Sequence, residues 1–440
     1  MTKARTSSLL CEQHLSDGTR VYTTRPDLDA PIAQIHCVFA LPSAQPNIPG
    51  EIPVLLEWMQ RGTAKRSRSE IFDAFGALGI EPQLSMLQSG VLFSIQCLDA
   101  CRDLALAYVR ELLYQPAFDA DELADVFEEL DEDDSACRDD PEQISYRAQR
   151  LARWHGTTLS APVNGTRRTR AQLDEKYLRA LHQEVFSRPA ILGIASERSD
   201  AWVQSLSGAL ISDRPVRTHD YTPPSLDTID AKPRNISVHA PTLEHAIVVC
   251  YSPGPQDQDP QQLAASFLHH EALTEGMSAP LMMQLRGQQA LSYAVSSQLI
   301  DRGTGWDQCF EIEPSPERVT EAIDAARALW TRTELLTEED FRRAWIGFET
   351  QERLQTIDAR RALSHALRQE ILWNRSLDWR ANHVDALRKV QPHEAMARGT
   401  HYGMSQDPLC TIVIAKRGRL SAPWNQEIFE LDDLFDGWAL

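Results

Sequence analysis

The sequence predicts an α+β protein of two similar tandem halves, each a mostly antiparallel sheet with helices packed on one face. Three observations predict this fold. Strand-like and helix-like segments alternate along the chain, one strand–helix pattern occurs in both halves, and a proline-rich stretch lies between them. The chain has 440 residues, which is more than one ordinary domain needs and enough for two hydrophobic cores.

The strand–helix pattern suggests a repeat. A strand pattern at 90–98 precedes a helix pattern, and a strand pattern at 305–314 precedes another. Ile95 and Ile312 would be corresponding positions, about half the chain apart, as a tandem duplication requires. Any strand followed by a helix gives a similar pattern, so the duplication is a hypothesis at this point.

The boundary between the halves is expected at residues 213–242. This stretch contains five prolines: Pro215, Pro223, Pro224, Pro233 and Pro241. Proline fixes φ and has no amide donor, so this density favours an extended linker over a helix or a central strand. The predicted organisation is an N-terminal half at 1–212, the linker, and a C-terminal half at 243–440.

Local signals are clearest in the first half. Residues 32–41 are strand-like, and Ser67 and Glu70 form a capping-box pattern that opens a helix. Long helices are expected at about 119–153 and 338–373. A further helix is predicted from apolar residues at helical spacing: Ile52, Leu55, Leu56 and Met59.

The composition argues against two classes of partner. A net charge of −19 disfavours nucleic acid and anionic membrane surfaces, because both require concentrated Lys and Arg.

No apolar run approaches the roughly 20 residues of a membrane span, and the N-terminus lacks the apolar core of a signal peptide. The eight cysteines are scattered, which favours buried reduced thiols over a disulfide framework. We therefore expect a cytoplasmic protein that binds neither nucleic acid nor membrane.

Several segments of the chain resemble segments of the pitrilysin/insulinase family of zinc peptidases (inverzincins), and they occur in the same order. The resemblance is to the small two-domain members, which pair into dimers. The resemblance spans nearly the whole chain. Its segments are the first-strand pattern His14–Tyr22, the helix frame from Gly50 to Gly62-Thr63, the landmarks Asp140-Pro141 and Val163–Thr166, and the second-half signatures Gly276–Leu281 and Arg286–Tyr293.

The zinc motif of that family is missing from the helix frame. In active members, an HxxEH motif supplies two zinc-binding histidines and a glutamate that activates water. Alignment on the framing glycines puts Pro53, Leu56 and Glu57 at these three positions. A shift of one residue gives Val54, Glu57 and Trp58. Neither alignment supplies a histidine pair, so the resemblance implies that this chain binds no zinc and cannot hydrolyse peptides alone.

The family's third zinc ligand is a glutamate in a downstream helix. Here residues 121–134 offer nine carboxylates: Asp121, Glu122, Asp125, Glu128, Glu129, Asp131, Glu132, Asp133 and Asp134. Carboxylates alone bind hard ions such as Ca²⁺, usually in loops. We therefore interpret this run as a solvated helix face.

Arg286 and Tyr293 match a second feature of the family. In active members, an Arg and a Tyr at this spacing contact the substrate carbonyl near the scissile bond, as hydrogen-bond donors. The alternative is that the two residues have no role in binding, and are a surface arginine and a tyrosine of a strand. Two departures weaken the match: Thr274–Met277 replaces a longer glycine-rich loop, and Gln288–Ala290 replaces a Lys-x-Gly sequence. His269 and His270 lie in an apolar helix pattern and are expected to pack.

The resemblance implies a zinc-free subunit of a heterodimeric metallopeptidase. A homologous sister subunit would supply HxxEH and zinc, while this chain contributes Arg286, Tyr293 and part of the chamber that holds the peptide substrate. One alternative is a non-enzymatic peptide-binding or scaffold protein that forms a homodimer, or an assembly subunit of a larger complex. Another is a self-sufficient hydrolase that uses a different metal site.

Overall fold

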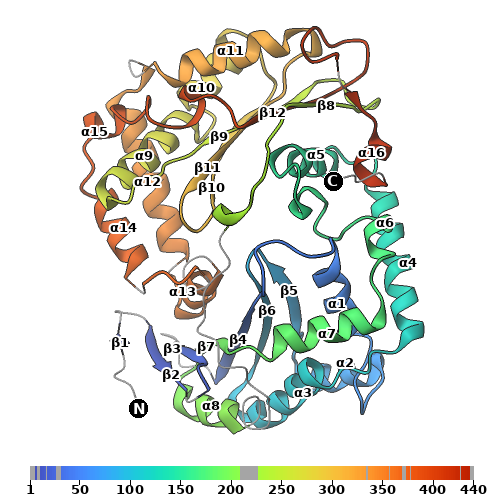
Figure 1. The fold of residues 1–440 in the computed structure, drawn as a ribbon. Coiled ribbons are helices and arrows are strands. Elements are labelled where there is room, and N and C mark those ends of the chain that lie inside the picture. Colours follow the sequence, from blue (N-terminus) through green and yellow to red (C-terminus); the bar gives the residue numbers. More distant parts are fainter. Residues whose placement is uncertain are drawn as a thin grey trace. The chain divides into compact units, whose positions relative to one another are not determined.

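The computed structural model describes residues 5–6, 10–15, 17–25, 31–208, 226–332, 335–355, 357–368, 373–376, 378–426 and 428–436. The chain divides into two compact units (Figure 1). The first unit comprises residues 1–130, 169–224 and 352–379, and the second comprises 131–168, 225–351 and 380–440. These boundaries differ from the predicted halves, because each unit takes a segment from the other half of the sequence.

The sheet of the first unit has the order β1-β2-β3-β7-β4-β6-β5 among the described strands. Its pairs are antiparallel except β3 with β7, which is parallel. The strands are β1 (Arg5–Thr6), β2 (Cys11–His14), β3 (Arg20–Thr24), β4 (Ile32–Ala40), β5 (Gln83–Leu87), β6 (Gly90–Leu98) and β7 (Ala190–Ala195).

The sheet of the second unit has the order β10-β11-β9-β12-β8-β13 in the described part of the chain. β8 pairs in parallel with β12 and β13, and the other pairs are antiparallel. The strands are β8 (Ile236–His239), β9 (Ile247–Pro253), β10 (Val295–Asp301), β11 (Trp306–Ile312), β12 (Cys410–Ala415) and β13 (Ile428–Phe429).

The two sheets repeat one topology. The order β3-β7-β4-β6-β5 in the first corresponds to β8-β12-β9-β11-β10 in the second, with the parallel pair at the same place. Ile95 on β6 lies opposite Ile35 on β4, and Ile312 on β11 lies opposite Val248 on β9. The predicted α+β fold of two similar halves is confirmed, and the repeated order is what a tandem duplication predicts.

The helices of the first unit cover both faces of its sheet. One face buries a large core that includes Phe39, Trp58, Phe93 and Trp202. The helices wholly in this unit are α1 (Glu51–Met59), α2 (Arg68–Gly76), α3 (Arg102–Tyr114), α7 (Glu175–Phe186), α8 (Ser199–Leu206) and α13 (Ala359–Ala366). The capping box predicted at Ser67 and Glu70 is confirmed at the start of α2.

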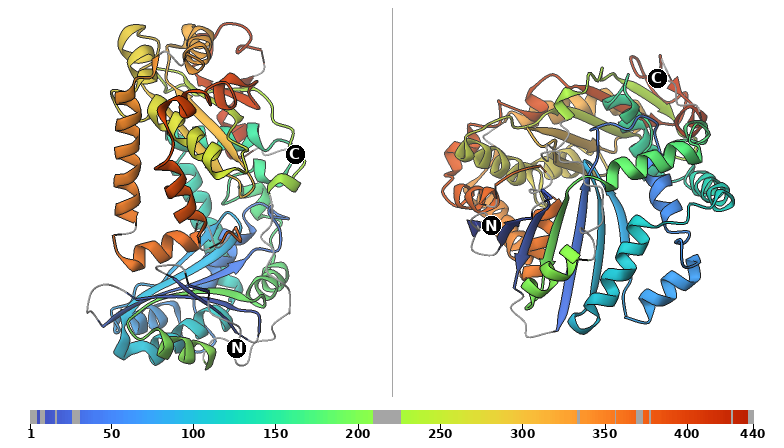
Figure 2. Two further views of the ribbon diagram at one scale, coloured as in Figure 1. Left: turned by 90° about the vertical axis from the view of Figure 1, so that its left-hand side faces the viewer. Right: turned by 60° about the horizontal axis from the view of Figure 1, so that its bottom comes forward.

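The opposite face of the first sheet is covered by α13, as the left view of Figure 2 shows. Leu363 and Leu367 pack against Leu92 and Ile191 in a separate apolar cluster. Gly193 on β7 makes this close approach feasible, because a Cβ there would lie 2.4 Å from a Leu367 methyl carbon. The prediction of helices on one face is therefore incomplete, since α13 covers the second face.

The second unit has the same arrangement, with α5 on one face of its sheet and α9 and α11 on the other. Its helices are α5 (Pro141–Arg153), α9 (Pro260–Thr274), α10 (Pro280–Met282), α11 (Val319–Trp330), α15 (Pro392–Met396) and α16 (Leu431–Phe435). Four of the described helices contain a unit boundary: α4 (Ala120–Ala136), α6 (Arg167–Arg170), α12 (Glu338–Gln355) and α14 (Trp379–Leu387). Short helical turns are η1 (Asp99–Cys101), η2 (Thr158–Ser160), η4 (Leu226–Thr228), η5 (Met283–Gln288), η6 (Pro316–Arg318) and η9 (Gly403–Ser405).

The long helices expected at 119–153 and 338–373 are each two helices. Asp140 caps α5 by accepting a hydrogen bond from the Glu142 amide, and Pro141 at its first turn has no amide to continue α4. Asp358 caps α13 in the same way after α12. These breaks let α5 join the second unit and α13 the first.

Buried polar contacts hold α5 on the second sheet. Arg153 Nε donates to Asp307 Oδ2 at 2.8 Å, and Arg302 Nε lies 3.0 Å from the other carboxylate oxygen. The hydroxyl of Tyr251 on β9 donates to Gln149 Oε1 of α5 at 2.8 Å. Asp307 is buried, and its charge is matched by two guanidinium groups.

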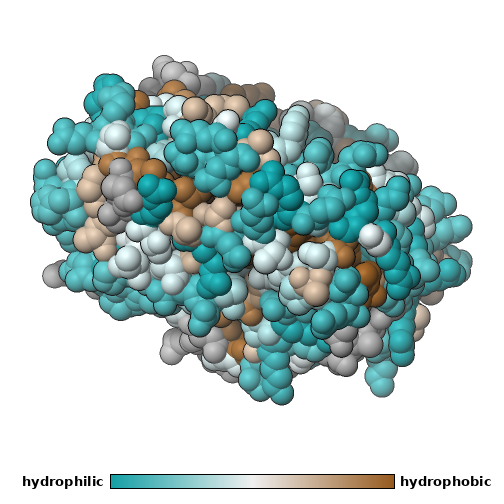
Figure 3. Space-filling model, turned by 90° about the horizontal axis from the view of Figure 1, so that it is seen from above, coloured by the Kyte–Doolittle hydropathy of each residue, from teal (hydrophilic) through white to brown (hydrophobic). Residues whose placement is uncertain are grey.

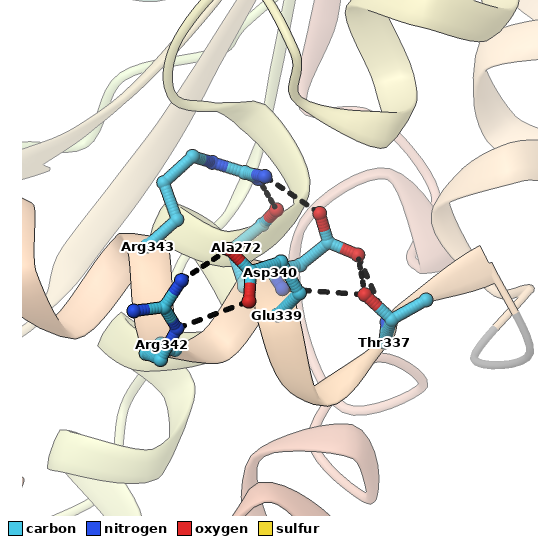
Figure 4. Close-up of polar contacts among 6 residues, drawn as sticks. All are labelled: Ala272, Thr337, Glu339, Asp340, Arg342 and Arg343. Carbon is cyan, nitrogen blue, oxygen red and sulfur yellow. Dashed lines mark hydrogen bonds and ion pairs between the residues drawn. The ribbon is translucent and has the colours of Figure 1, made fainter.

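The start of α12 is fixed on α9 within the second unit (Figure 4). Thr337 and Asp340 cap the helix reciprocally. Arg343 pairs with Asp340 at 2.7 Å and donates to the Ala272 carbonyl at 3.0 Å. Burial opposes ionisation of Asp340, but the hydrogen bonds from Thr337 and Arg343 keep its pKa below the ordinary value.

The predicted linker at 213–242 is partly wrong. Residues 213–225 lie outside the described residues. In the described remainder, residues 236–239 form β8, which has a neighbour on each side in the second sheet. Pro233 and Pro241 flank this strand instead of interrupting it, which is where proline is tolerated.

None of the described helices combines the length and apolar character needed to cross a membrane. Figure 3 shows a face on which hydrophilic residues predominate and apolar residues form small separate patches.

Candidate functional site

The helix frame that should carry the zinc motif is α1, in the first unit. Gly50 precedes it with a φ of 92°, a conformation that favours glycine. The buried carboxylate of Glu51 accepts hydrogen bonds from the amides of Asn47 and Ile48 at 3.0 and 3.1 Å. The hydroxyl of Tyr177 on α7 also donates to it. The start of α1 is therefore fixed by a carboxylate at the positive end of the helix.

The two sequence alignments place their motif positions at differently buried residues of α1. Val54 and Trp58 are fully buried, and Trp58 Nε1 donates to the Asp119 carbonyl at 2.7 Å. Pro53 is partly exposed, Glu57 is exposed and Leu56 is buried. Metal ligands must face an accessible site, so the alignment that uses Pro53, Leu56 and Glu57 fits the geometry. The shifted alignment would place the ligands in the core.

An ion pair adjoins this face of α1. Arg61 follows the helix, has a nearly buried side chain, and forms a bidentate pair with Glu129 of α4, with Nη1 donating to Oε1 at 3.0 Å. The hydrogen bond from Arg61 lowers the pKa of Glu129. The hydrogen bond to Glu129 and the charge of Glu129, followed by the charges of Glu57 and Glu122, raise the pKa of Arg61. The guanidinium of Arg61 therefore compensates the charge of Glu129.

Arg286 and Tyr293 lie together in the second unit. Arg286 belongs to η5, a π-helical turn, and its guanidinium carbon lies 5.3 Å from the centre of the Tyr293 ring. Tyr293 has its amide hydrogen-bonded to the Glu313 carbonyl at 2.9 Å, and it is 63% exposed. Both side chains can therefore donate hydrogen bonds to a group outside the unit.

Sequence reasoning missed His245. Its ring stacks on Tyr293, with centroids 5.9 Å apart and planes at 9°. His245 precedes β9 while Tyr293 precedes β10, and β11 lies between these strands in the sheet. No spacing along the chain connects the two residues. The strand order of the sheet was the signal needed to find the contact.

Comparisons with known proteins relate the chain to one family of peptidases. Residues 175–346 match a family model described as Peptidase M16 inactive domain. A peptidase M16 inactive domain from Pseudomonas fluorescens is similar in structure, with a TM-score of 0.75, 16% identity, and coverage of 94% of this chain and 99% of that one. Over residues 175–346 the chain is a homologue of the M16, or pitrilysin, peptidases.

Other solved structures share the fold of this M16 homologue. A protease from Helicobacter pylori has a TM-score of 0.77 at 14% identity, covering 92% of this chain and 99% of that one. The periplasmic protease PqqL from Escherichia coli has a TM-score of 0.73 at 15% identity, and the match covers 94% of this chain but 46% of PqqL. A comparison with curated proteins gave no match.

The motif helix of this M16 homologue does not fit zinc. Pro53 and Leu56 have no ligating side-chain atom, and Glu57 alone cannot form a zinc site. Among the residues that the structure describes, no group of three or more His, Cys, Asp and Glu side chains is placed to hold a metal. On α4, the exposed carboxylates are Asp121, Asp125, Glu128, Glu129, Glu132 and Asp133, as a solvated face requires.

The adjacent histidines of α9 pack inside the second unit. His269 Nδ1 lies 3.2 Å from the Tyr402 hydroxyl, and His270 Nε2 lies 3.0 Å from Ser297 Oγ. Burial lowers the pKa of His269 to about 3, so the ring is neutral at physiological pH. These histidines stabilise the interior, as the sequence pattern predicts.

Proposed function

We propose that this chain is the zinc-free subunit of a heterodimeric metallopeptidase. The observation that supports this most strongly is the contrast between two sites. The motif helix α1 has no zinc ligands, whereas Arg286 and Tyr293 lie side by side on an accessible surface of the second unit. Without zinc ligands of its own, the chain can use this pair in peptide hydrolysis only if another subunit supplies the metal.

In this proposal the partner is a homologous subunit with an intact HxxEH motif and zinc. The metal supplies water activation there. This chain supplies Arg286 and Tyr293, whose N–H and O–H groups donate to the carbonyl oxygen beside the scissile bond of the peptide substrate. The exposure of Tyr293 supports this role, because a buried phenol could not reach a carbonyl on a substrate. The chain also contributes half of the chamber in this proposal.

The test is a mixed complex with an HxxEH homologue. Arg286→Ala and Tyr293→Phe should each lower kcat/KM by about 100- to 1,000-fold, the effect of losing one transition-state donor, without preventing assembly. Arg342→Ala is the matched control, because Arg342 is an exposed arginine of the same unit that pairs with Glu339. Unchanged activity in both Arg286→Ala and Tyr293→Phe complexes would exclude the role in trans.

A second candidate is a homodimeric protein that binds peptides without cleaving them. The exposed pair also supports this function, since two donors can hold a carbonyl without a metal. The two proposals differ in what co-purifies. A zinc-bearing homologue supports the heterodimer, whereas a stable homodimer that binds peptides supports the alternative.

We place the protein in the cytoplasm as part of the same proposal. Five of its eight cysteines are buried and all eight are free thiols, which suits a reducing compartment. The similar structure of PqqL comes from a periplasmic protein, so fractionation of cells is the direct check.

A further inference from the structure

The side of α13 that faces away from the first sheet carries positive charge, although the chain as a whole is acidic. The helix packs on the first sheet through Leu363, Ala366 and Leu367. Its other side carries polar residues at helical spacing: Arg361, Ser364, His365 and Arg368. We call Arg361 and Arg368, with the surface between them, the basic stripe. It lies on a chain whose net charge is −19.

The positive charge of the basic stripe is poorly compensated. The Arg361 side chain is 67% exposed, and it lies 3.9 Å from Asp358, at the limit of an ion pair. That carboxylate already caps α13, accepting from the amides of Arg360 and Arg361 at 2.8 and 2.9 Å. Arg368 is exposed, and within the described ranges no ion pair joins it to a carboxylate. By contrast, the exposed Arg342 of α12 is bidentate with Glu339.

The positive charge of Arg368 affects a buried histidine of the first unit. His36 on β4 is buried, with Nδ1 2.8 Å from Ser94 Oγ. Burial first, and then the charge of Arg368, lowers the pKa of His36 to about 4. The Arg368 side chain is exposed, so its guanidinium can also contact an external anion.

Exposed apolar side chains lie just before the basic stripe in the chain. Ile357 is 63% exposed and Leu354 is 46% exposed. An arginine pair preceded by exposed apolar residues has the composition of a recognition surface, in which apolar contact adds to charge complementarity. An acidic peptide with an apolar flank has the matching chemistry.

The length of the basic stripe limits the ligand. Arg361 and Arg368 are seven residues apart, which is about 10 Å along a helix. In an extended polyproline-II peptide, side chains three residues apart lie on the same side and about 9 Å apart. We propose that the basic stripe of α13 binds an acidic peptide segment with carboxylates at positions i and i+3. Only one part of this inference rests on the proposed function, namely that the acidic segment belongs to a peptide substrate.

The test uses the whole chain without any partner subunit. A labelled peptide of about ten residues, with Glu at i and i+3 and a leucine flank, is titrated by fluorescence anisotropy against versions with Gln or Lys at the two positions. We expect the Glu peptide to bind at least about tenfold more tightly than the Gln peptide, and the Lys peptide not to bind. Salt at about 0.5 M should abolish binding, because exposed charges are screened.

Variants assign the binding to the basic stripe. The double variant R361Q/R368Q should weaken binding of the Glu peptide by about tenfold, as expected for two exposed charge contacts. R361K/R368K should keep most of it, and R342Q should leave it unchanged. Equal binding of the Glu and Gln peptides, or full binding by R361Q/R368Q, would overturn the inference. Because no partner is present, this result is independent of whether the mixed complex cleaves peptides.

Discussion

The motif helix of the first unit and the arginine–tyrosine pair of the second have opposite characters. In α1, the residues beside the lost motif are packed into the core, and the nearby carboxylate of Glu129 is neutralised by Arg61. In the second unit, Arg286 in η5 and Tyr293 just before β10 are exposed and contact each other. The difference shows that the residues around α1 contribute to packing, whereas the exposed side chains of Arg286 and Tyr293 can donate hydrogen bonds to a ligand. Four predictions test this contrast.

The largest effect is expected at Trp58, which is fully buried beside the motif positions. Trp58→Ala removes a large core side chain and its hydrogen bond to Asp119, and should lower the free energy of unfolding by about 3–5 kcal/mol. Glu57→Ala, the exposed neighbour, should change it by less than about 0.5 kcal/mol. Denaturant titration measures both. Similar effects for the two variants would show that α1 is not part of the core.

The next effect concerns pH. Burial lowers the pKa of His36 to about 4 and that of His269 to about 3, whereas the unfolded chain titrates near 6.5. The unfolded state therefore binds more protons as pH falls below 6.5. Stability should be full above that pH and fall by about 1.4 kcal/mol per pH unit for each histidine, down to the folded pKa. His36→Gln and His269→Gln should each reduce the slope in unfolding experiments between pH 6.5 and 5.

A smaller effect is expected from the ion pair beside α1. Glu129→Ala leaves the guanidinium of Arg61 nearly buried without its carboxylate, and should cost about 1–3 kcal/mol of stability. Arg61→Met removes the buried charge and leaves Glu129 largely exposed, so it should cost less. Thermal unfolding of the two variants gives the comparison. If Arg61→Met proved the more harmful, the guanidinium would contribute more by packing than by charge.

The smallest effect is expected at the second site. Tyr293→Ala and Arg286→Ala alter exposed side chains, and each should change the free energy of unfolding by less than about 0.5 kcal/mol. The same denaturant titration used for Trp58 applies. A loss above about 2 kcal/mol would mean that the pair holds the fold together, and its activity data could not be attributed to substrate binding.

Much of the fold follows from local patterns. The strand at β4, the capping box of α2 and the strand–helix repeat at β6 and β11 are visible in the sequence, because periodicity and capping are local properties. Periodicity shows that a helix has a buried face but does not identify the sheet that buries it. The exchange of α5 and α13 between units could not be predicted for this reason.

Some features of the candidate site can likewise be predicted from the sequence, and others cannot. The loss of the first zinc-binding histidine at Pro53 and of the water-activating glutamate at Leu56 is evident from residue types alone. The contact between Arg286 and Tyr293 needed a resemblance to suggest it, because a π-helical turn has no clear sequence signature. His245 joins them through the strand order of the sheet. The basic stripe of α13 emerged once the structure showed which side of that helix is buried.

The central claim is that one catalytic site is divided between two chains. Metal analysis of the purified chain, alone and in complex with an HxxEH homologue, tests it most directly. The account predicts no bound zinc on the isolated chain and about one zinc per heterodimer, carried by the partner's single catalytic site. One equivalent of tightly held zinc on the isolated chain would contradict the account.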